Sequence, residues 1–104
     1  MNKRLAMLEK MFEAGQADSF VLYALAMEYR KEKRTADAMK SFEELREKEP
    51  SYLPQYLMAG QILTEEGRAT DAKIWLEQGL KVAATAGDAK TLGELEAALE
   101  EVSD

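Results

Sequence analysis

The stretches Ala38-Met39-Lys40-Ser41-Phe42 and Ala72-Lys73-Ile74-Trp75-Leu76 decide the fold of this 104-residue chain. Each begins with a small residue and ends, four places later, with a large apolar one, and the second stretch lies 34 residues after the first. The same offset pairs further positions: Leu22 with Tyr56, Leu25 with Ala59, Ala26 with Gly60 and Tyr29 with Leu63. Residues 19–50 are therefore repeated as residues 53–84, with the three- and four-residue spacing of amphipathic helices.

A helical repeat of about 34 residues indicates an array of stacked helix pairs. The sequence resembles the tetratricopeptide repeat family, whose pattern is Trp-x-x-Leu-Gly-x-x-Tyr, then Ala-x-x-x-Phe, then Pro. The departures from this pattern preserve size and polarity: Leu22 and Tyr56 replace the Trp, Ala26 the Gly, Leu63 the Tyr, and Ala84 the final Pro. The resemblance implies an all-α, right-handed superhelical stack of antiparallel helix pairs, a TPR-like α-solenoid of about six helices.

We expect one domain, residues 1–104, in four parts: a lead-in helix in 1–17, repeat 1 in 18–50, repeat 2 in 53–84 and a C-terminal capping helix in 88–104. Both flanking helices show an apolar stripe at helical spacing. The stripes consist of Leu5, Leu8, Met11 and Phe12 in the lead-in helix and of Leu92, Leu95, Leu99 and Val102 in the capping helix. An outward face rich in glutamate suits an end cap, because a terminal repeat needs a polar outer surface.

Local signals set the expected helix ends. Asp18 or Ser19 can accept amide hydrogens at the start of one helix, and Thr35 can do so for the next. Lys33 stands where the second repeat has Gly67, so we expect a left-handed turn residue at both positions, at a cost of ~1 kcal/mol for the lysine. We expect Pro50 to end the second helix of repeat 1 and Pro54 to open the first helix of repeat 2. The second helix of repeat 2 should break near Thr85 and Gly87, and Asp88 should cap the last helix.

Composition argues against several partners. The 14 basic and 20 acidic residues give a net charge of −6 and a sequence pI near 4.8, which opposes binding to nucleic-acid phosphates or to an anionic membrane surface. The longest apolar run, Phe20–Met27, is far shorter than the ~20 residues of a membrane span, and the N-terminal segment lacks the pattern of a signal peptide. We therefore expect a cytoplasmic protein that binds neither nucleic acid nor membrane.

The chain also lacks the residues of most catalytic mechanisms. It contains no His and no Cys, so imidazole and thiolate chemistry and the transition-metal sites built from them are excluded. Its carboxylates alternate with Lys and Arg along helix faces, and no Gly-rich phosphate loop occurs. We expect no enzyme activity, no catalytic residue, no cofactor and no metal site.

A second apolar stripe remains on the first helix of each repeat after the packing positions are removed. In repeat 1 it consists of Phe20, Tyr23, Met27 and Arg30, and in repeat 2 of Leu57 and Gln61 with Met58 beside them, flanked by Pro54 and Thr64. An ordinary surface helix would be polar there. The family resemblance implies that this stripe lines a concave groove, so we expect a protein-interaction adaptor that binds a peptide or helix of another protein.

Three coverings of this groove stay open at the level of sequence. The flanking helices can fold over it, above all the C-terminal helix, a partner segment can lie in it next to the adaptable Met27 and Met58, or a second copy can hide it in a homodimer. The family's carboxylate clamp for heat-shock chaperones is missing, since Tyr23, Met27 and Met58 occupy its positions and only Lys90 is compatible with it. Lys31, Lys33 and Arg34 form, with Arg30, a basic rim that can hold an acidic ligand, although a solvated turn explains them better.

Overall fold

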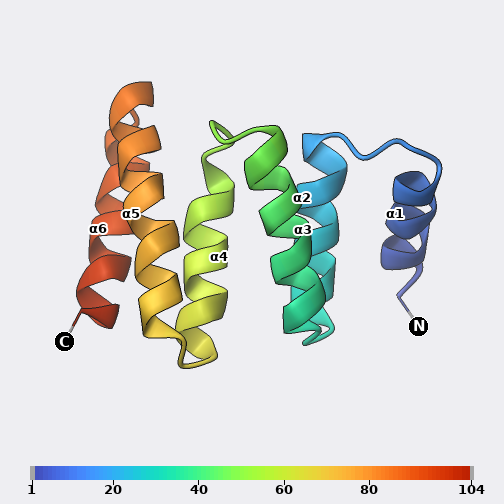
Figure 1. The fold of residues 1–104 in the computed structure, drawn as a ribbon, viewed down its shortest axis with the longest axis horizontal. Coiled ribbons are helices and arrows are strands. Elements are labelled where there is room, and N and C mark those ends of the chain that lie inside the picture. Colours follow the sequence, from blue (N-terminus) through green and yellow to red (C-terminus); the bar gives the residue numbers. More distant parts are fainter. Residues whose placement is uncertain (1, 104) are drawn as a thin grey trace. The chain divides into compact units, whose positions relative to one another are not determined.

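The computed structural model describes residues 2–103, which form six α-helices and no strand (Figure 1). The all-α fold expected from the sequence is therefore confirmed. The helices are α1 (Lys3–Glu13), α2 (Ser19–Lys31), α3 (Thr35–Lys48), α4 (Pro54–Glu65), α5 (Ala69–Ala86) and α6 (Ala89–Val102).

The chain divides into two compact units, Met1–Tyr52 and Leu53–Asp104. The first unit contains α1, α2 and α3, and the second contains α4, α5 and α6. Each unit thus holds one complete repeat hairpin together with one flanking helix.

In the first unit, α2 packs against both α1 and α3. Leu5 and Leu8 are the buried residues of α1, and they form a cluster with Val21, Ala24 and Leu25 of α2. Fully burying a leucine stabilises a fold by about 1.5–3 kcal/mol, so these two side chains supply much of the attachment of α1. On α3, the small and bulky members of the repeated pair, Ala38 and Phe42, are both completely buried, as their packing role requires.

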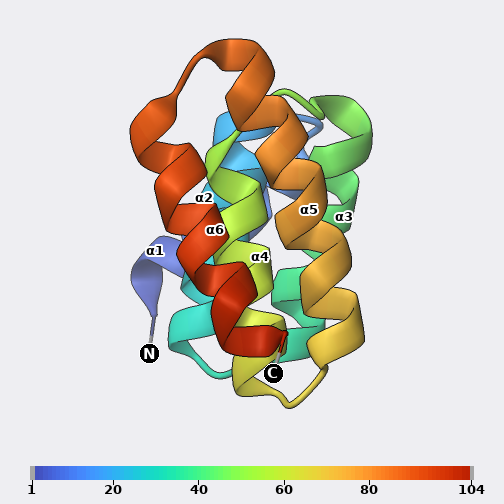
Figure 2. The same cartoon turned by 90° about the vertical axis from the view of Figure 1, so that its left-hand side faces the viewer.

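In the second unit, α5 packs against both α4 and α6, and α4 also contacts α6 (Figure 2). Two glycines allow these helices to approach closely. A Cβ added at Gly60 of α4 would overlap the side chain of Leu76, and one added at Gly79 of α5 would lie 2.6 Å from the Cβ of Tyr56 and 3.1 Å from a methyl carbon of Leu95. The missing side chains at both glycines therefore let α5 pack closely against α4, and Gly79 also lets α6 approach α5.

The turn inside each repeat hairpin has the same geometry in both units. Lys33 adopts φ 59° and Gly67 adopts φ 75°, which confirms the left-handed residue expected at both positions. The next amide closes the turn in the same way, with Arg34 N donating to Tyr29 O at 2.9 Å and Arg68 N donating to Leu63 O at 2.9 Å. The two repeats therefore match in backbone hydrogen bonding as well as in sequence.

Most of the expected helix ends are confirmed. Asp18 caps α2 by accepting a hydrogen bond from Val21 N at 2.9 Å, and Asp88 caps α6 by accepting one from Thr91 N at 3.0 Å. Pro54 is the first residue of α4.

Two expected helix ends differ in the structure. The prediction that Thr35 caps α3 is wrong, because Thr35 is the first residue of that helix and Arg34 occupies the cap position without a side-chain cap bond. Arg34 instead forms an ion pair with Asp37, at 2.9 Å, in the first turn of the helix. Helix α5 also includes Thr85 and Ala86, where a break was expected, and ends at Gly87, whose φ is 70°.

Candidate functional site

In the first unit, the expected binding residues lie along one face of α2. Phe20, Tyr23, Met27 and Arg30 are three or four positions apart, so the helix places them in one row. Phe20 has 63% of its surface exposed, and the other three side chains are half-buried. We call this row the α2 strip.

Tyr23 links the α2 strip to the core of the first unit. Its ring makes an edge contact with Phe42, at 6.1 Å between ring centroids, and a tilted contact with Tyr52 at 5.4 Å. Burial, followed by the nearby Tyr52, raises the pKa of the Tyr23 phenol, while Arg30 opposes this shift. Tyr23 is therefore a partly structural residue, and Phe20 is the most accessible residue of the strip.

In the second unit, Leu57, Met58 and Gln61 are half-buried on α4. Leu57 and Met58 line a hollow of about 250 Å³, and Gln61 lies outside it. The other lining residues are Leu53 and Pro54 beside them and Asp88, Thr91 and Glu94 near the start of α6. Helix α6 thus forms one wall of the hollow, and its most buried side chain, Leu95, packs near Gly79 of α5.

The cations of the expected basic rim are largely engaged within the first unit. The Lys31 ammonium lies 3.6 Å from a carboxylate oxygen of Glu28. The Arg34 guanidinium pairs with Asp37 and also lies over the ring of Tyr29, 4.6 Å from its centroid. This arrangement agrees with a solvated turn that neutralises its own charges.

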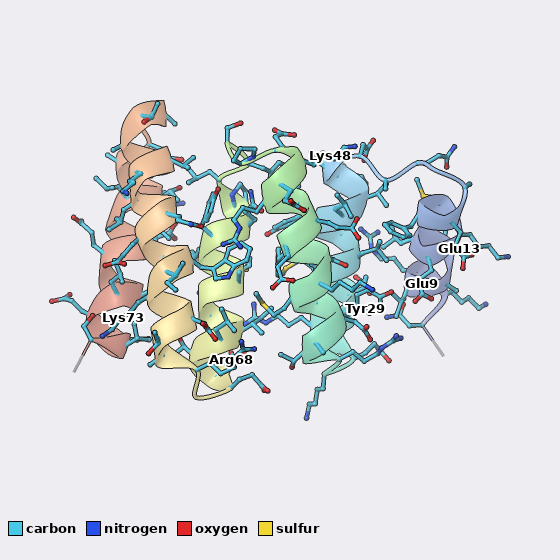
Figure 3. The ribbon with its side chains drawn as sticks, viewed as in Figure 1. Glu9, Glu13, Tyr29, Lys48, Arg68 and Lys73 are labelled. Carbon is cyan, nitrogen blue, oxygen red and sulfur yellow. The ribbon has the colours of Figure 1, made fainter. Side chains whose placement is uncertain are left out.

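A second hollow, which the sequence did not indicate, lies between α1 and α2. It encloses about 460 Å³ and is lined by Ala6, Glu9, Lys10, Phe12 and Glu13 of α1 and by Leu25 and Tyr29 of α2. Figure 3 shows Glu9 and Tyr29 close together between these two helices, with Glu13 further along α1. We call this hollow the α1–α2 pocket.

The α1–α2 pocket is bridged by a hydrogen bond. The Tyr29 hydroxyl donates to a carboxylate oxygen of Glu9 at 2.7 Å. Burial and this bond, together with the charge of Glu9, raise the pKa of Tyr29 to about 12. The phenol therefore stays protonated, and remains a donor, across the physiological range.

A polar network around Glu28 also attaches α1 to α2. Glu28 is buried, accepts a hydrogen bond from the Asn2 amide at 3.1 Å and pairs with the Arg4 guanidinium at 3.3 Å. The hydrogen bond from Asn2, with smaller contributions from Lys31 and Arg4, holds the pKa of Glu28 below its ordinary value. Asn2 also caps α1 through a bond from Leu5 N at 3.0 Å, so one residue both starts α1 and attaches it to α2.

Residues 2–103 contain no group of three or more acidic side chains placed to hold a metal ion. In the same range, no helix is both long enough and apolar enough to cross a bilayer.

These features define a class of protein, the helical-repeat proteins, because two hairpins with one turn geometry recur 34 residues apart. The sequence matches the model of the tetratricopeptide repeat family over residues 21–45 and 56–85, and the chain belongs to this family. Among curated proteins, none matches the sequence.

Solved structures agree with this assignment. A crystal structure of a tetratricopeptide repeat domain protein from Salinibacter ruber is 36% identical over 83% of this chain and 97% of that chain, with a TM-score of 0.77. A solution structure of a tetratricopeptide repeat domain protein from the same organism is 36% identical over 82% of this chain and 86% of that chain, with a TM-score of 0.76. The solution structure of a protein from Bordetella parapertussis has the same fold at 22% identity, over 99% of this chain and 90% of that chain, with a TM-score of 0.84.

Proposed function

We propose that this chain is a non-catalytic protein-interaction module that binds an apolar peptide or helix of a cytoplasmic partner protein on the first helix of each repeat. The family supports the general class, because stacked helical repeats present extended surfaces that bind other proteins. The proposed contact residues are Phe20, Tyr23, Met27 and Arg30 on α2 and Leu57, Met58 and Gln61 on α4.

The exposure of Phe20 is the observation that carries this proposal. Its side chain has 63% of its surface in water although it belongs to a continuous apolar run. A phenylalanine left exposed forgoes about 1.5–3 kcal/mol of burial, which a partner that covers it recovers on binding. Met27 lies two turns along the same face and is only half-buried, so the apolar surface continues beyond a single side chain.

The second unit offers apolar contact of a similar kind. Leu57 and Met58 belong to the apolar lining of a hollow of about 250 Å³. Methionine is unbranched and polarisable, so Met27 and Met58 can adapt to apolar side chains of different shape. This chemistry suits a segment with aliphatic or aromatic anchors.

Affinity capture from a lysate of the source organism tests the proposal with matched variants. Phe20→Ala with Met27→Ala removes accessible apolar surface from α2, and Leu57→Ala with Met58→Ala does so on α4. Ile74→Ala is the control, because Ile74 is 47% exposed on α5 and belongs to neither face. We expect both double variants to lose a captured protein that wild type and the control retain, with unchanged helical circular dichroism.

Two results would contradict the proposal. One is capture of the same proteins by the wild type and by both double variants. The other is a dimer, detected by light scattering, that Phe20→Ala with Met27→Ala dissociates, because a second copy of the chain would then fill the α2 strip.

A further inference from the structure

The α1–α2 pocket combines aromatic rings with carboxylates. Phe12, which lines the pocket from α1, is 38% exposed, and Tyr29 lines the pocket from α2. Glu9 and Glu13, one turn apart on α1, line the same space. Aromatic faces and carboxylates are the two groups that attract an organic cation, through the ring quadrupole and through charge.

One cation already occupies such a position within the first unit. The Arg34 guanidinium lies 4.6 Å from the centroid of the Tyr29 ring and is paired with Asp37 at 2.9 Å. A guanidinium between an aromatic ring and a carboxylate is therefore an arrangement that this unit builds for itself. Phe12 and Glu13 also line the pocket with an aromatic ring and a carboxylate, and among residues 2–103 no arginine lines it.

The charge around the pocket is negative. The α1–α2 pocket shares Phe12, Leu25 and Tyr29 with a smaller hollow of about 160 Å³ that reaches α3. The charged residues lining the two hollows are the acidic Glu9, Glu13, Asp37 and Glu44 and the basic Lys10 and Lys40. When Arg34, which pairs with Asp37, is counted with these residues, one negative charge is left over, so a cationic group is favoured over an anionic one.

We propose that the α1–α2 pocket binds an arginine of a partner protein, with the guanidinium stacked on Phe12 and paired with Glu13. Arginine suits the site better than lysine, because its planar guanidinium stacks on a ring and forms two parallel hydrogen bonds with a carboxylate. The binding site is distinct from the α2 strip, since its residues lie on α1 and on the side of α2 that packs against α1.

Titration of the ¹⁵N-labelled full chain with short peptides, followed by NMR, tests the proposal. The probe is acetyl-Gly-Arg-Leu-Arg-Gly-amide, and the control peptide has glutamine in place of both arginines. We expect shifts in the amide signals of Phe12, Glu13 and Tyr29. The arginine peptide should bind about three- to tenfold more tightly than the glutamine peptide, because it gains one stacking contact and one exposed ion pair. Added salt should weaken binding of the arginine peptide more than binding of the control.

Variants of the pocket separate the contributions. Phe12→Ala and Glu13→Gln should each remove most of the preference for the arginine peptide over the control. Lys10→Gln should strengthen binding of the arginine peptide, and Phe20→Ala on the α2 strip should leave that binding unchanged. Three results would overturn the proposal: no shift in α1 and α2 at millimolar arginine peptide, equal affinity for both peptides, or a dimer that Phe12→Ala dissociates, which would make a second copy the occupant. Because Phe20→Ala reports on the strip alone, the two binding sites are tested independently.

Discussion

Replacing Gly79 with alanine should push apart helices that approach closely at this glycine, a contact that the sequence did not indicate. The added Cβ would lie 2.6 Å from the Cβ of Tyr56 on α4 and 3.1 and 3.2 Å from the two methyl carbons of Leu95 on α6. Carbon atoms pack at about 3.5–4.0 Å, so α4 and α5 would have to move apart by roughly 1 Å. Tyr56 cannot relieve the contact by rotating, because its Cβ is fixed to the backbone of α4.

The magnitude follows from two opposing terms. Overpacking a well-packed core costs about 1–3 kcal/mol, and a 2.6 Å approach to a fixed atom lies at the upper end of that range. Alanine recovers about 0.8–1 kcal/mol of helix propensity relative to glycine. The expected net loss in free energy of unfolding is therefore about 1–2 kcal/mol.

Gly93→Ala is the matched control for this prediction. Gly93 lies in α6, and no atom lies within 4 Å of a Cβ added there, so only the propensity gain of about 0.8–1 kcal/mol applies. In urea denaturation followed by circular dichroism, the midpoint of Gly79→Ala should lie below that of wild type and the midpoint of Gly93→Ala above it. The m-value should be unchanged in both variants. A Gly79→Ala variant as stable as Gly93→Ala would refute the packing argument.

Three further predictions concern the turn, a cap and the pocket. Lys33→Gly should raise the free energy of unfolding by about 1 kcal/mol in urea denaturation, because a φ of 59° strains a lysine and not a glycine. Asp88→Ala should lower the urea midpoint and speed hydrogen exchange at Thr91, whose amide would lose its acceptor. Tyr29→Phe should remove the tyrosine that ionises near pH 12 in absorbance titration at 295 nm. Since the folded state keeps this phenol protonated while the unfolded state loses its proton near pH 10, wild type should lose stability relative to Tyr29→Phe between about pH 10 and 12.

The sequence predicted those parts of the fold that depend on local chemistry. The 34-residue spacing identified both hairpins, and the correspondence of Lys33 with Gly67 predicted the left-handed turn in each. The caps at Asp18 and Asp88 followed from side-chain oxygens placed just before an apolar period. Thr35 misled because it precedes the apolar pattern in the same way, although it is already the first residue of α3 and the cap position falls on Arg34, which makes no side-chain cap bond.

The parts that depend on contacts distant in sequence could not be predicted in the same way. Gly79 corresponds to Leu45 in the first repeat, and only the approach of Tyr56 and Leu95 shows why a small residue stands there. Tyr29 matched a packing position of the repeat, so its bond to Glu9, twenty residues earlier, was not expected. The α1–α2 pocket was missed for the same reason, since it exists only where α1 meets the side of α2.

The structure explains only part of the apolar character of the run Phe20–Met27. One side of α2 packs against α1 through Val21, Ala24 and Leu25, and the fully buried Ala26 belongs to the packed part as well. If packing alone had determined this sequence, the remaining side would be polar, as on other surface helices. It carries the exposed Phe20 instead, with Tyr23 and Met27 half-buried. The interior of the first unit therefore accounts for part of the apolar surface of α2, and the part that it leaves uncovered is the surface on which we propose that a partner binds.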